Sequence, residues 1–165
     1  MLIGIVSDSH DNILRIGQAV QMFNSQSVAL VLHAGDYVAP FTIAEFKRLN
    51  CPLIGVLGNN DGDHELLEKR FSETSNCTLH DRFTQIVQED FRIGLLHGDE
   101  TELLSVLIES GYFDFIVHGH SHVHSIKRRG KTLFINPGEL CGYLTEKSTI
   151  ALLDTTTKEA QIIEL

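Results

Sequence analysis

The sequence predicts an α/β fold in which two β-sheets pack face to face, with helices outside. In the first half of the chain, short apolar runs alternate with segments of helical apolar spacing, which is typical of a parallel sheet. The second half adds several further short apolar runs, and so many strands in a small chain favour two packed sheets. The 165 residues contain no internal repeat, low-complexity segment or linker-like run, so we expect one domain over residues 1–165.

The elements of the first half begin with a buried strand. Residues 2–6 form a short apolar run, as a strand covered on both faces does. Residues 12–23 follow with apolar side chains at helical spacing, and Asp11 or Asn12 can cap this helix. The alternation then continues with strands at 28–32 and 52–57 and helices at 40–49 and 63–71.

The second half is expected to contain mainly paired strands. Residues 83–88 and 91–96 resemble a hairpin around Glu89 and Asp90. A helix at 103–110 and a buried strand at 113–117 come next. The remaining strands are expected at 125–128 and 132–135, joined by the basic turn 129–131, and in a last hairpin at 149–154 and 160–165.

The charge balance of the chain argues against binding to polyanions. Acidic residues outnumber basic ones by 22 to 13, which gives a formal net charge of -9. Such a surface repels polyanions, so we expect no specific nucleic-acid binding. Bound cations would offset part of this charge locally.

The cysteines and the apolar runs indicate the cell compartment. Cys51, Cys77 and Cys141 form neither a CxxC pair nor a dense disulfide framework, so we expect free thiols in a reducing cytoplasm. The apolar run at 2–6 is too short for a signal peptide or a membrane span, and no later segment is long enough to cross a bilayer. The sequence therefore predicts a soluble cytoplasmic protein without membrane association.

Short polar clusters follow five of the expected strands. In open α/β sheets, ligands bind beyond the carboxyl ends of the strands, and a parallel sheet brings these ends to one rim. Glycines flank the polar residues and permit tight loops that aim side chains into a shared pocket. The clusters are Asp8-Ser9-His10, Gly35-Asp36, Gly58-Asn59-Asn60-Asp61, His97-Gly98-Asp99 and His118-Gly119-His120-Ser121-His122.

The residue types in these clusters are those that bind divalent metals. Carboxylate, amide oxygen and imidazole together suit manganese, iron, nickel or zinc. No cysteine lies in any cluster, so a structural thiolate zinc site is not expected. Asp8 and His10 alternate by two and can point to one side of an extended segment, and His120 and His122 repeat that spacing.

Each cluster by itself also has an ordinary explanation. Asp8-Ser9-His10 alone is typical of a loop with a helix cap, and Gly35-Asp36 is common turn chemistry. The segment 58–61 alone also favours a turn. The histidines of the segment 118–122 are less ordinary, because three histidines at alternate positions rarely serve packing. The five clusters together, each after a strand, favour a shared metal site.

The ordered set of clusters resembles the calcineurin-like metallophosphoesterase superfamily. The superfamily pattern reads D-x-H, G-D, G-N-H-[DE], H and G-H-x-H, and the five clusters follow it in the same order. The short chain and the segment 136–139 (Asn-Pro-Gly-Glu) are similar to the small YfcE-type phosphodiesterases of bacteria and archaea. The resemblance implies the metallophosphoesterase fold, a sandwich of two mixed β-sheets flanked by helices.

The resemblance also implies a centre of two divalent metal ions, with manganese first and nickel, iron or zinc as alternatives. Asp36 would bridge the two ions, and a hydroxide between them would attack the phosphorus atom. The first ion would be held by Asp8, His10, Asp36 and His122, and the second by Asp36, Asn59, His97 and His120.

The chain departs from the superfamily pattern at Asn60. Many members have a histidine here, which stabilises the phosphate or protonates the leaving group. Asn60 can bind substrate by donating a hydrogen bond, but it cannot deliver a proton at neutral pH. Asp61 matches the pattern, and we expect it to orient a neighbouring residue. Asn60 and Asp61 are thus the expected catalytic residues beside the metal ligands.

Several further histidines and the residues after the segment 136–138 lie outside the implied ligand set. His33 is expected to pack or to support the site, and His118 to support the neighbouring pair of histidines. His64, His80 and His124 are expected at the surface, where His64 or His124 could reach a substrate. The residues after the segment 136–138 could line the pocket, but a plain turn is favoured there; they are Glu139, Cys141 and Tyr143.

Three kinds of function compete under this resemblance. The first is metal-dependent hydrolysis of a small phosphoester, in particular a phosphodiester. The alternative is a protein-binding scaffold of the same fold with little or no catalysis, which the presence of all the expected metal ligands disfavours. A DNA nuclease is disfavoured by the missing capping domain and the charge of -9. A homo-oligomer is compatible with each of them.

Overall fold

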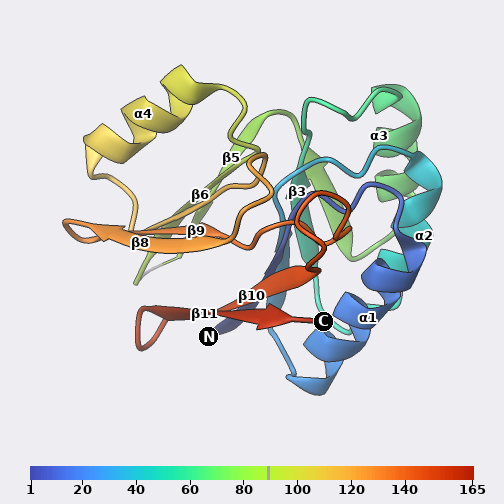
Figure 1. Cartoon of the computed structure of the whole chain (residues 1–165), viewed down its shortest axis with the longest axis horizontal. Helices are drawn as coiled ribbons and strands as arrows, with labels where there is room; N and C mark the ends of the chain where they lie inside the picture. The colour runs from blue at the N-terminus through green and yellow to red at the C-terminus, as the bar shows by residue number, and fades with distance from the viewer. Residues whose placement is uncertain (89) are drawn as a thin grey trace.

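The computed structural model describes residues 1–88 and 90–165, and within them two β-sheets stack face to face with helices on both outer sides (Figure 1). The first sheet has six strands in the order β11 (Glu159–Glu164), β10 (Thr149–Asp154), β1 (Leu2–Val6), β2 (Leu30–His33), β3 (Leu53–Val56) and β4 (Cys77–His80). The second has five strands in the order β5 (Phe83–Val87), β6 (Arg92–Leu96), β7 (Phe115–Val117), β9 (Thr132–Asn136) and β8 (Ser125–Arg129). The predicted sandwich is confirmed.

Both sheets are mixed, as the family resemblance implied. Strands β1 to β4 run parallel to one another, while β10 and β11 add antiparallel pairs at the other edge. In the second sheet, β6, β7 and β9 run parallel, and the edge strands β5 and β8 pair antiparallel. In each sheet, the carboxyl ends of three or more parallel strands therefore lie at the same edge, where a ligand site can form.

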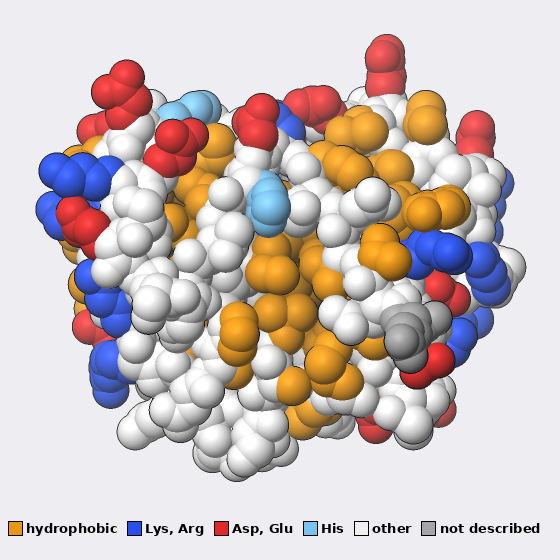
Figure 2. Space-filling view, turned by 180° about the vertical axis from the view of Figure 1, so that it is seen from behind, with side chains coloured by type: hydrophobic (Ala, Val, Ile, Leu, Met, Phe, Trp, Pro, Cys, Tyr) orange, Lys and Arg blue, Asp and Glu red, His pale blue; other side chains and the backbone are white. Residues whose placement is uncertain are grey.

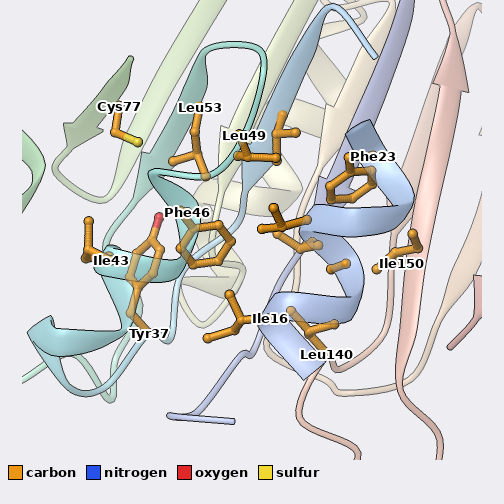
Figure 3. Close-up of a cluster of buried hydrophobic side chains, with 14 of the residues drawn as sticks. Ile16, Phe23, Tyr37, Ile43, Phe46, Leu49, Leu53, Cys77, Leu140 and Ile150 are labelled. Carbon is orange, nitrogen blue, oxygen red and sulfur yellow. The ribbon is translucent and has the colours of Figure 1, made fainter. Parts of the chain in front are cut away.

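Helices cover the outer face of each sheet. The six-stranded sheet carries α1 (Ile13–Ser25), α2 (Ile43–Phe46) and α3 (His64–Ser72). Figure 3 shows side chains of α1 and α2, among them Ile16, Phe23 and Phe46, packed together with Leu53 of β3. On the five-stranded sheet, α4 (Thr101–Ser110) packs its leucines more loosely, since none of its residues is fully buried.

A second apolar layer joins the two sheets. Ile5 and Leu32 of the six-stranded sheet and Phe115 and Ile135 of the five-stranded sheet are all 0% exposed and belong to this layer. From behind, hydrophobic side chains form a band down the middle of the molecule, with charged side chains to either side (Figure 2). The burial of both faces of the strands explains their continuous apolar runs.

The first predicted helix is confirmed together with its cap. Helix α1 begins at Ile13, and the side chain of Asn12 accepts a hydrogen bond from the backbone N–H of Arg15. This contact satisfies one of the amides that every helix leaves unpaired at its start. Of the two candidate caps, Asn12 is therefore the residue used.

Two other segments differ from the predictions, and a third is confirmed but contains one residue that the structure does not describe. The single helix expected at 40–49 is a 3-10 turn, Pro40–Thr42, followed by the short α2, and i→i+3 bonds at Arg48 and Leu49 keep its end tight. Strand β4 was not predicted, because its four residues at the sheet edge carry too short a pattern. The hairpin of β5 and β6 is confirmed, although Glu89 in its expected turn lies outside the described residues.

The three cysteines are free and buried, as expected for thiols that take no part in disulfides. In the part of the chain that the structure describes, none of the helices combines the length and the apolar character needed to cross a bilayer.

Phe115→Ala tests the layer between the sheets. The ring is 0% exposed and packs between both sheets, so its removal leaves a cavity. We expect the free energy of unfolding to fall by about 3–5 kcal/mol, measured by urea denaturation. The matched control is Phe41→Ala, whose ring is 58% exposed and which should change stability by no more than about 0.5 kcal/mol. Equal losses in the two variants would contradict this assignment of the core.

Candidate metal centre

The five polar clusters lie directly after strands β1, β2, β3, β6 and β7, and backbone hydrogen bonds tie their loops together. The amide of Asp8 donates to the carbonyl of Gly35 (3.0 Å), and that of His10 donates to the carbonyl of Asp36 (3.1 Å). In the other sheet, the amide of Gly119 donates to the carbonyl of His97 (2.8 Å). These bonds join neighbouring clusters within each sheet, while Asp61 accepts the amide of Asp36 and His97 contacts Ala34 and Asp36 across the sheets. The five clusters thus converge at one rim, as their spacing predicts.

The backbone at this rim adopts a conformation that L-residues rarely take. Positive φ angles occur at Asp8 (52°), His10 (36°), Asp36 (62°), His120 (66°) and His122 (60°). A non-glycine residue in this region costs about 1–2 kcal/mol, so the surrounding structure must compensate. Such strain concentrates at functional sites, where it aims side chains that a relaxed loop would not bring together.

The first group of converging side chains consists of Asp8, His10 and His122. Their candidate ligand atoms all lie within 4.8 Å of one another. Oδ1 of Asp8 lies 3.9 Å from Nε2 of His10 and 3.5 Å from Nε2 of His122. The two imidazole rings stack with their centres 5.3 Å apart. With metal–ligand bonds of about 2.0–2.2 Å, one cation can reach atoms at these separations.

A second group forms around Asp36 and His97. Oδ2 of Asp36 lies 3.4 Å from Nε2 of His97 and also 3.4 Å from Nε2 of His10, so Asp36 lies between the two groups. Oδ1 of Asn59 lies 3.1 Å from Nε2 of His97. The ring of His120 meets that of His97 edge to face at 5.1 Å. The structure therefore brings all seven sequence-predicted ligand residues to one place.

The orientation of His97 brings three electron-pair donors together. Its Nδ1 donates to the carbonyl of Ala34 (2.7 Å), so the neutral ring has its lone pair on Nε2. That lone pair faces Oδ1 of Asn59 and Oδ2 of Asp36, which are also electron-pair donors. Three such atoms facing one another need either a second ring proton or a cation between them.

Two buried atoms of the first group also fit a cation. Among the described residues, Oδ1 of Asp8 and Nε2 of His10 have no hydrogen-bond partner of good geometry. Buried polar atoms are nearly always paired, so unpaired ones at a strained rim require an explanation. Carboxylate oxygens and imidazole nitrogens are ligands of divalent transition metals, and the residues present therefore fit such ions.

The buried carboxylates and the imidazoles of the two groups shift one another's pKa values. Burial would raise the pKa of Asp36, but the neighbouring imidazoles of His10 and His97 and the amide of Asn60 outweigh it and hold this pKa below its usual range. Burial raises the pKa of Asp8. The adjacent Asp36 carboxylate raises the pKa of His10. Burial would lower the pKa of His97, but the carboxylates of Asp36 and Asp8 together outweigh it and raise this pKa as well. The centre thus holds an ionised carboxylate that attracts protons or other cations.

Asn60 and Asp61 hold Asp36 and its loop in place. Asn60 donates to the Asp36 carboxylate twice, from its backbone amide to Oδ1 (2.9 Å) and from Nδ2 to Oδ2 (2.7 Å). Asp61 is buried and accepts the amides of Asp36 (3.0 Å), Val38 (2.7 Å) and Gly58 (2.7 Å). Asp61 therefore orients the two loops, while the exposed Asn60 borders the space above Asp36.

The histidines outside the proposed ligand set either pack inside the protein or lie at its surface. His33 is fully buried, stacks on Tyr37 at 3.9 Å and lies 3.0 Å from the hydroxyl of Ser9, so its expected packing role is confirmed. Burial lowers the pKa of His33 to about 3, which keeps the ring neutral. His118 is half-buried with its Nδ1 3.4 Å from the amide nitrogen of Asn136. The surface positions expected for His64, His80 and His124 are confirmed.

Glu139, which the sequence indicates only as a possible pocket residue, lies in direct contact with the site. A plain turn was favoured after residues 136–138, yet Glu139 is 0% exposed and its Oε2 accepts Nδ1 of His122 at 2.8 Å. The signal that could have found it is topological. Because β9 runs parallel to β7, its carboxyl end reaches the same rim as the five clusters. The hairpin pattern of 125–135 concealed this relationship.

Comparisons with known proteins agree with this geometry. Residues 1–158 match the family model described as the calcineurin-like phosphoesterase superfamily domain. A phosphodiesterase of Methanocaldococcus jannaschii is 39% identical over 165 residues, which cover 100% of this chain and 99% of the relative. The family resemblance seen in the motifs is thereby confirmed.

Solved structures share the fold. The structure of an archaeal phosphodiesterase superposes with a TM-score of 0.95 at 38% identity, covering 100% of both chains. A phosphoesterase from E. coli superposes with a TM-score of 0.72 at 16% identity, covering 99% of this chain and 98% of that one. At 16% identity, the second similarity concerns the fold alone.

Gly119→Ala tests how tightly the rim is packed. A Cβ atom at Gly119 would overlap the hydroxyl of Ser7 and lie 2.6 Å from Oδ2 of Asp8. We expect the Asp8 carboxylate to move and the affinity for Mn²⁺ to fall by about 10–100-fold, measured by titration calorimetry. Gly62→Ala is the control, because a Cβ there meets nothing within 4 Å. Unchanged affinity in Gly119→Ala would argue against Asp8 as a ligand.

Proposed function

Because the chain belongs to the calcineurin-like phosphoesterase superfamily, we propose that it is a phosphodiesterase whose activity depends on two divalent cations. The observation that carries the proposal is the pair of overlapping groups around Asp8 and Asp36. Oδ2 of Asp36 lies 3.4 Å from a histidine nitrogen on either side, one in each group. A carboxylate shared in this way would suit a pair of divalent cations, as in two-metal phosphoesterase sites.

We assign the ligands as the family resemblance implied. One ion would be held by Asp8, His10, Asp36 and His122, and the other by Asp36, Asn59, His97 and His120. The distances within each group and the unpaired atoms of Asp8 and His10 support this assignment. The mixture of carboxylate, amide and imidazole ligands favours manganese, with iron, nickel and zinc as alternatives.

The cations would supply the Lewis acidity that hydrolysis of a phosphoester requires. The side chains around them would bind the substrate and hold the loops of the site in place. Asn60 would donate a hydrogen bond from Nδ2 to a phosphate oxygen, since this amide already reaches the centre of the site. Asp61 keeps the loops of Asp36 and Gly58 in register through three backbone amides. The contribution of Asn60 is preorganised, because its hydrogen bond to Asp36 fixes the side-chain amide before substrate arrives.

The substrate class follows from charge and from the relatives. The chain carries a net charge of -9, which disfavours nucleic acids and other polyanions. A small phosphodiester carries a single negative charge and can approach a site whose cations offset its surroundings. The M. jannaschii relative is named a phosphodiesterase, which agrees with this choice.

Asp36→Asn tests the bridging role. The metal-loaded parent should contain two divalent ions per chain by elemental analysis. The variant loses the shared negative charge, so we expect it to lose at least one ion and nearly all hydrolysis of bis(p-nitrophenyl) phosphate while remaining folded. Asp63→Asn is the control, because this exposed residue caps α3 and asparagine caps helices equally well. One ion or none in the parent, or full activity in Asp36→Asn, would refute the two-ion centre.

Asn60→His tests the missing proton donor. Asparagine cannot protonate a departing oxygen, so the rate of the parent should fall steeply as the pKa of the leaving group rises. A histidine at this position should flatten that dependence and help poor leaving groups most. General acid catalysis is worth about 10²–10⁴-fold, and an unsupported histidine should recover part of it. The measurement is the hydrolysis rate of a diester series with leaving groups of increasing pKa.

The control for this series is Asn50→His, which places a histidine at an exposed position on another loop. A shallow dependence in the parent would mean that a proton donor is already present, for which His64, His118 and His124 are the candidates. In that case Asn60→His should change little.

A further inference from the structure

The carboxylate of Glu139 is buried beside the proposed metal centre and its backbone is fixed there. The carbonyl of Glu139 accepts the amide of Thr149 (3.0 Å). The next two amides, of Leu140 and Cys141, donate to the carbonyls of Ser7 (2.9 Å) and Asp8 (3.0 Å). Glu139 is therefore attached to the same strand end that carries Asp8, and its position cannot shift independently of it.

Five donors converge on the two oxygens of this carboxylate. Oε2 accepts from Nδ1 of His122 (2.8 Å) and from Sγ of Cys141 (3.1 Å). Oε1 accepts from the amides of Leu144 (2.9 Å) and Thr145 (2.5 Å) and from the hydroxyl of Thr145 (2.7 Å). Burial would raise the pKa of Glu139, but these donors outweigh it and lower this pKa to about 2. A carboxylate has about four lone-pair positions, so its acceptor capacity is fully used.

The contact with Glu139 determines which way His122 can bind. With the proton on Nδ1 donated to Glu139, the neutral ring has its lone pair on Nε2. That atom lies 3.5 Å from Oδ1 of Asp8, inside the first group of proposed ligands. His97 is arranged in the same manner, with Nδ1 on the carbonyl of Ala34 and Nε2 on Asp36. In each case an acceptor outside the proposed centre turns Nε2 inward.

A separate cation site at Glu139 explains the contacts less well. The ligand atoms of His122, Glu139 and Cys141 lie within 4.8 Å of one another, which is compatible with a cation. The two oxygens of Glu139 are already occupied, because Oε2 accepts from His122 and from Sγ of Cys141, and Oε1 accepts from residues 144 and 145. Hydrogen bonds therefore account for the trio without a cation.

We propose that Glu139 is a positioning residue of the metal centre, which holds His122 with Nδ1 protonated and Nε2 directed at the ion beside Asp8, and which fastens residues 144–145 to that centre. The inference rests on the proposed function, since it assumes that His122 binds a cation. Carboxylates that orient a ligating histidine usually change metal affinity by about 10–100-fold when they are replaced.

Glu139→Gln is the decisive variant. Glutamine keeps the size of the side chain but offers one oxygen, and its NH₂ group would face either the amides of Leu144 and Thr145 or Nδ1 of His122. We expect Mn²⁺ affinity, measured by titration calorimetry, to fall by about 10–100-fold. Thr145→Val is the matched control, because it removes one donor to Glu139 and leaves the His122 contact intact. Its Mn²⁺ affinity should stay close to that of the parent.

A second measurement does not depend on whether the variants fold. In metal-free parent protein with ¹⁵N-labelled histidines, the nitrogen shifts of His122 should report the tautomer with the proton on Nδ1. The opposite tautomer would overturn the proposal, as would equal Mn²⁺ affinities for Glu139→Gln and the parent, or equal losses in Glu139→Gln and Thr145→Val. A parent that binds no Mn²⁺ would instead refute the proposed function itself, which keeps the two failures distinguishable.

Discussion

The burial of two carboxylates at one rim is the constraint on which the rest of this structure depends. Asp8 and Asp36 are 0% and 1% exposed, and an ionised carboxylate is costly to bury without a compensating charge. Within the described residues, their ion-pair partners are histidines alone, namely His10, His97 and His122. The two carboxylates therefore need either protonated imidazoles or another cation beside them.

The fold supplies the rigidity that this arrangement needs. Positive φ angles at Asp8, Asp36 and His122 would relax in a free loop, but here both cores hold the strands that precede them. Close packing adds to this restraint, since a Cβ atom at Gly58 would collide with the carboxylate of Asp36. Asp61 then pairs the amides of the Asp36 and Gly58 loops. The strain at the rim is therefore balanced by apolar burial and hydrogen bonds elsewhere.

Much of the fold and of the candidate site could be predicted from the sequence, because both leave local patterns. Buried parallel strands give continuous apolar runs, and the polar clusters stand directly after them, as at Asp8 and His97. Strand β4 escaped prediction because four edge residues carry almost no pattern. Glu139 escaped for another reason: its importance depends on the parallel pairing of β9 with β7, which is a non-local property. The sequence of the turn after β9 alone does not indicate that β7 lies beside that strand.

The separation between core and rim explains why the fold by itself says little about activity. Within the described residues, the three apolar clusters contain none of the seven proposed ligands, so a change at the rim need not disturb the packing. A relative could therefore keep the sandwich and lose the chemistry, as a scaffold of the same fold would.

The proposed ligands come from both sheets. Asp36 and Asn59 follow strands of the six-stranded sheet, and His97 and His122 follow strands of the five-stranded sheet. The site thus forms only when the two sheets pack together. The apolar layer between the sheets is therefore needed for the proposed catalysis, although a fold with the same layer could be inactive. The proposed catalysis depends instead on the rim, where the Asp36 carboxylate lies 3.4 Å from a histidine nitrogen on each side.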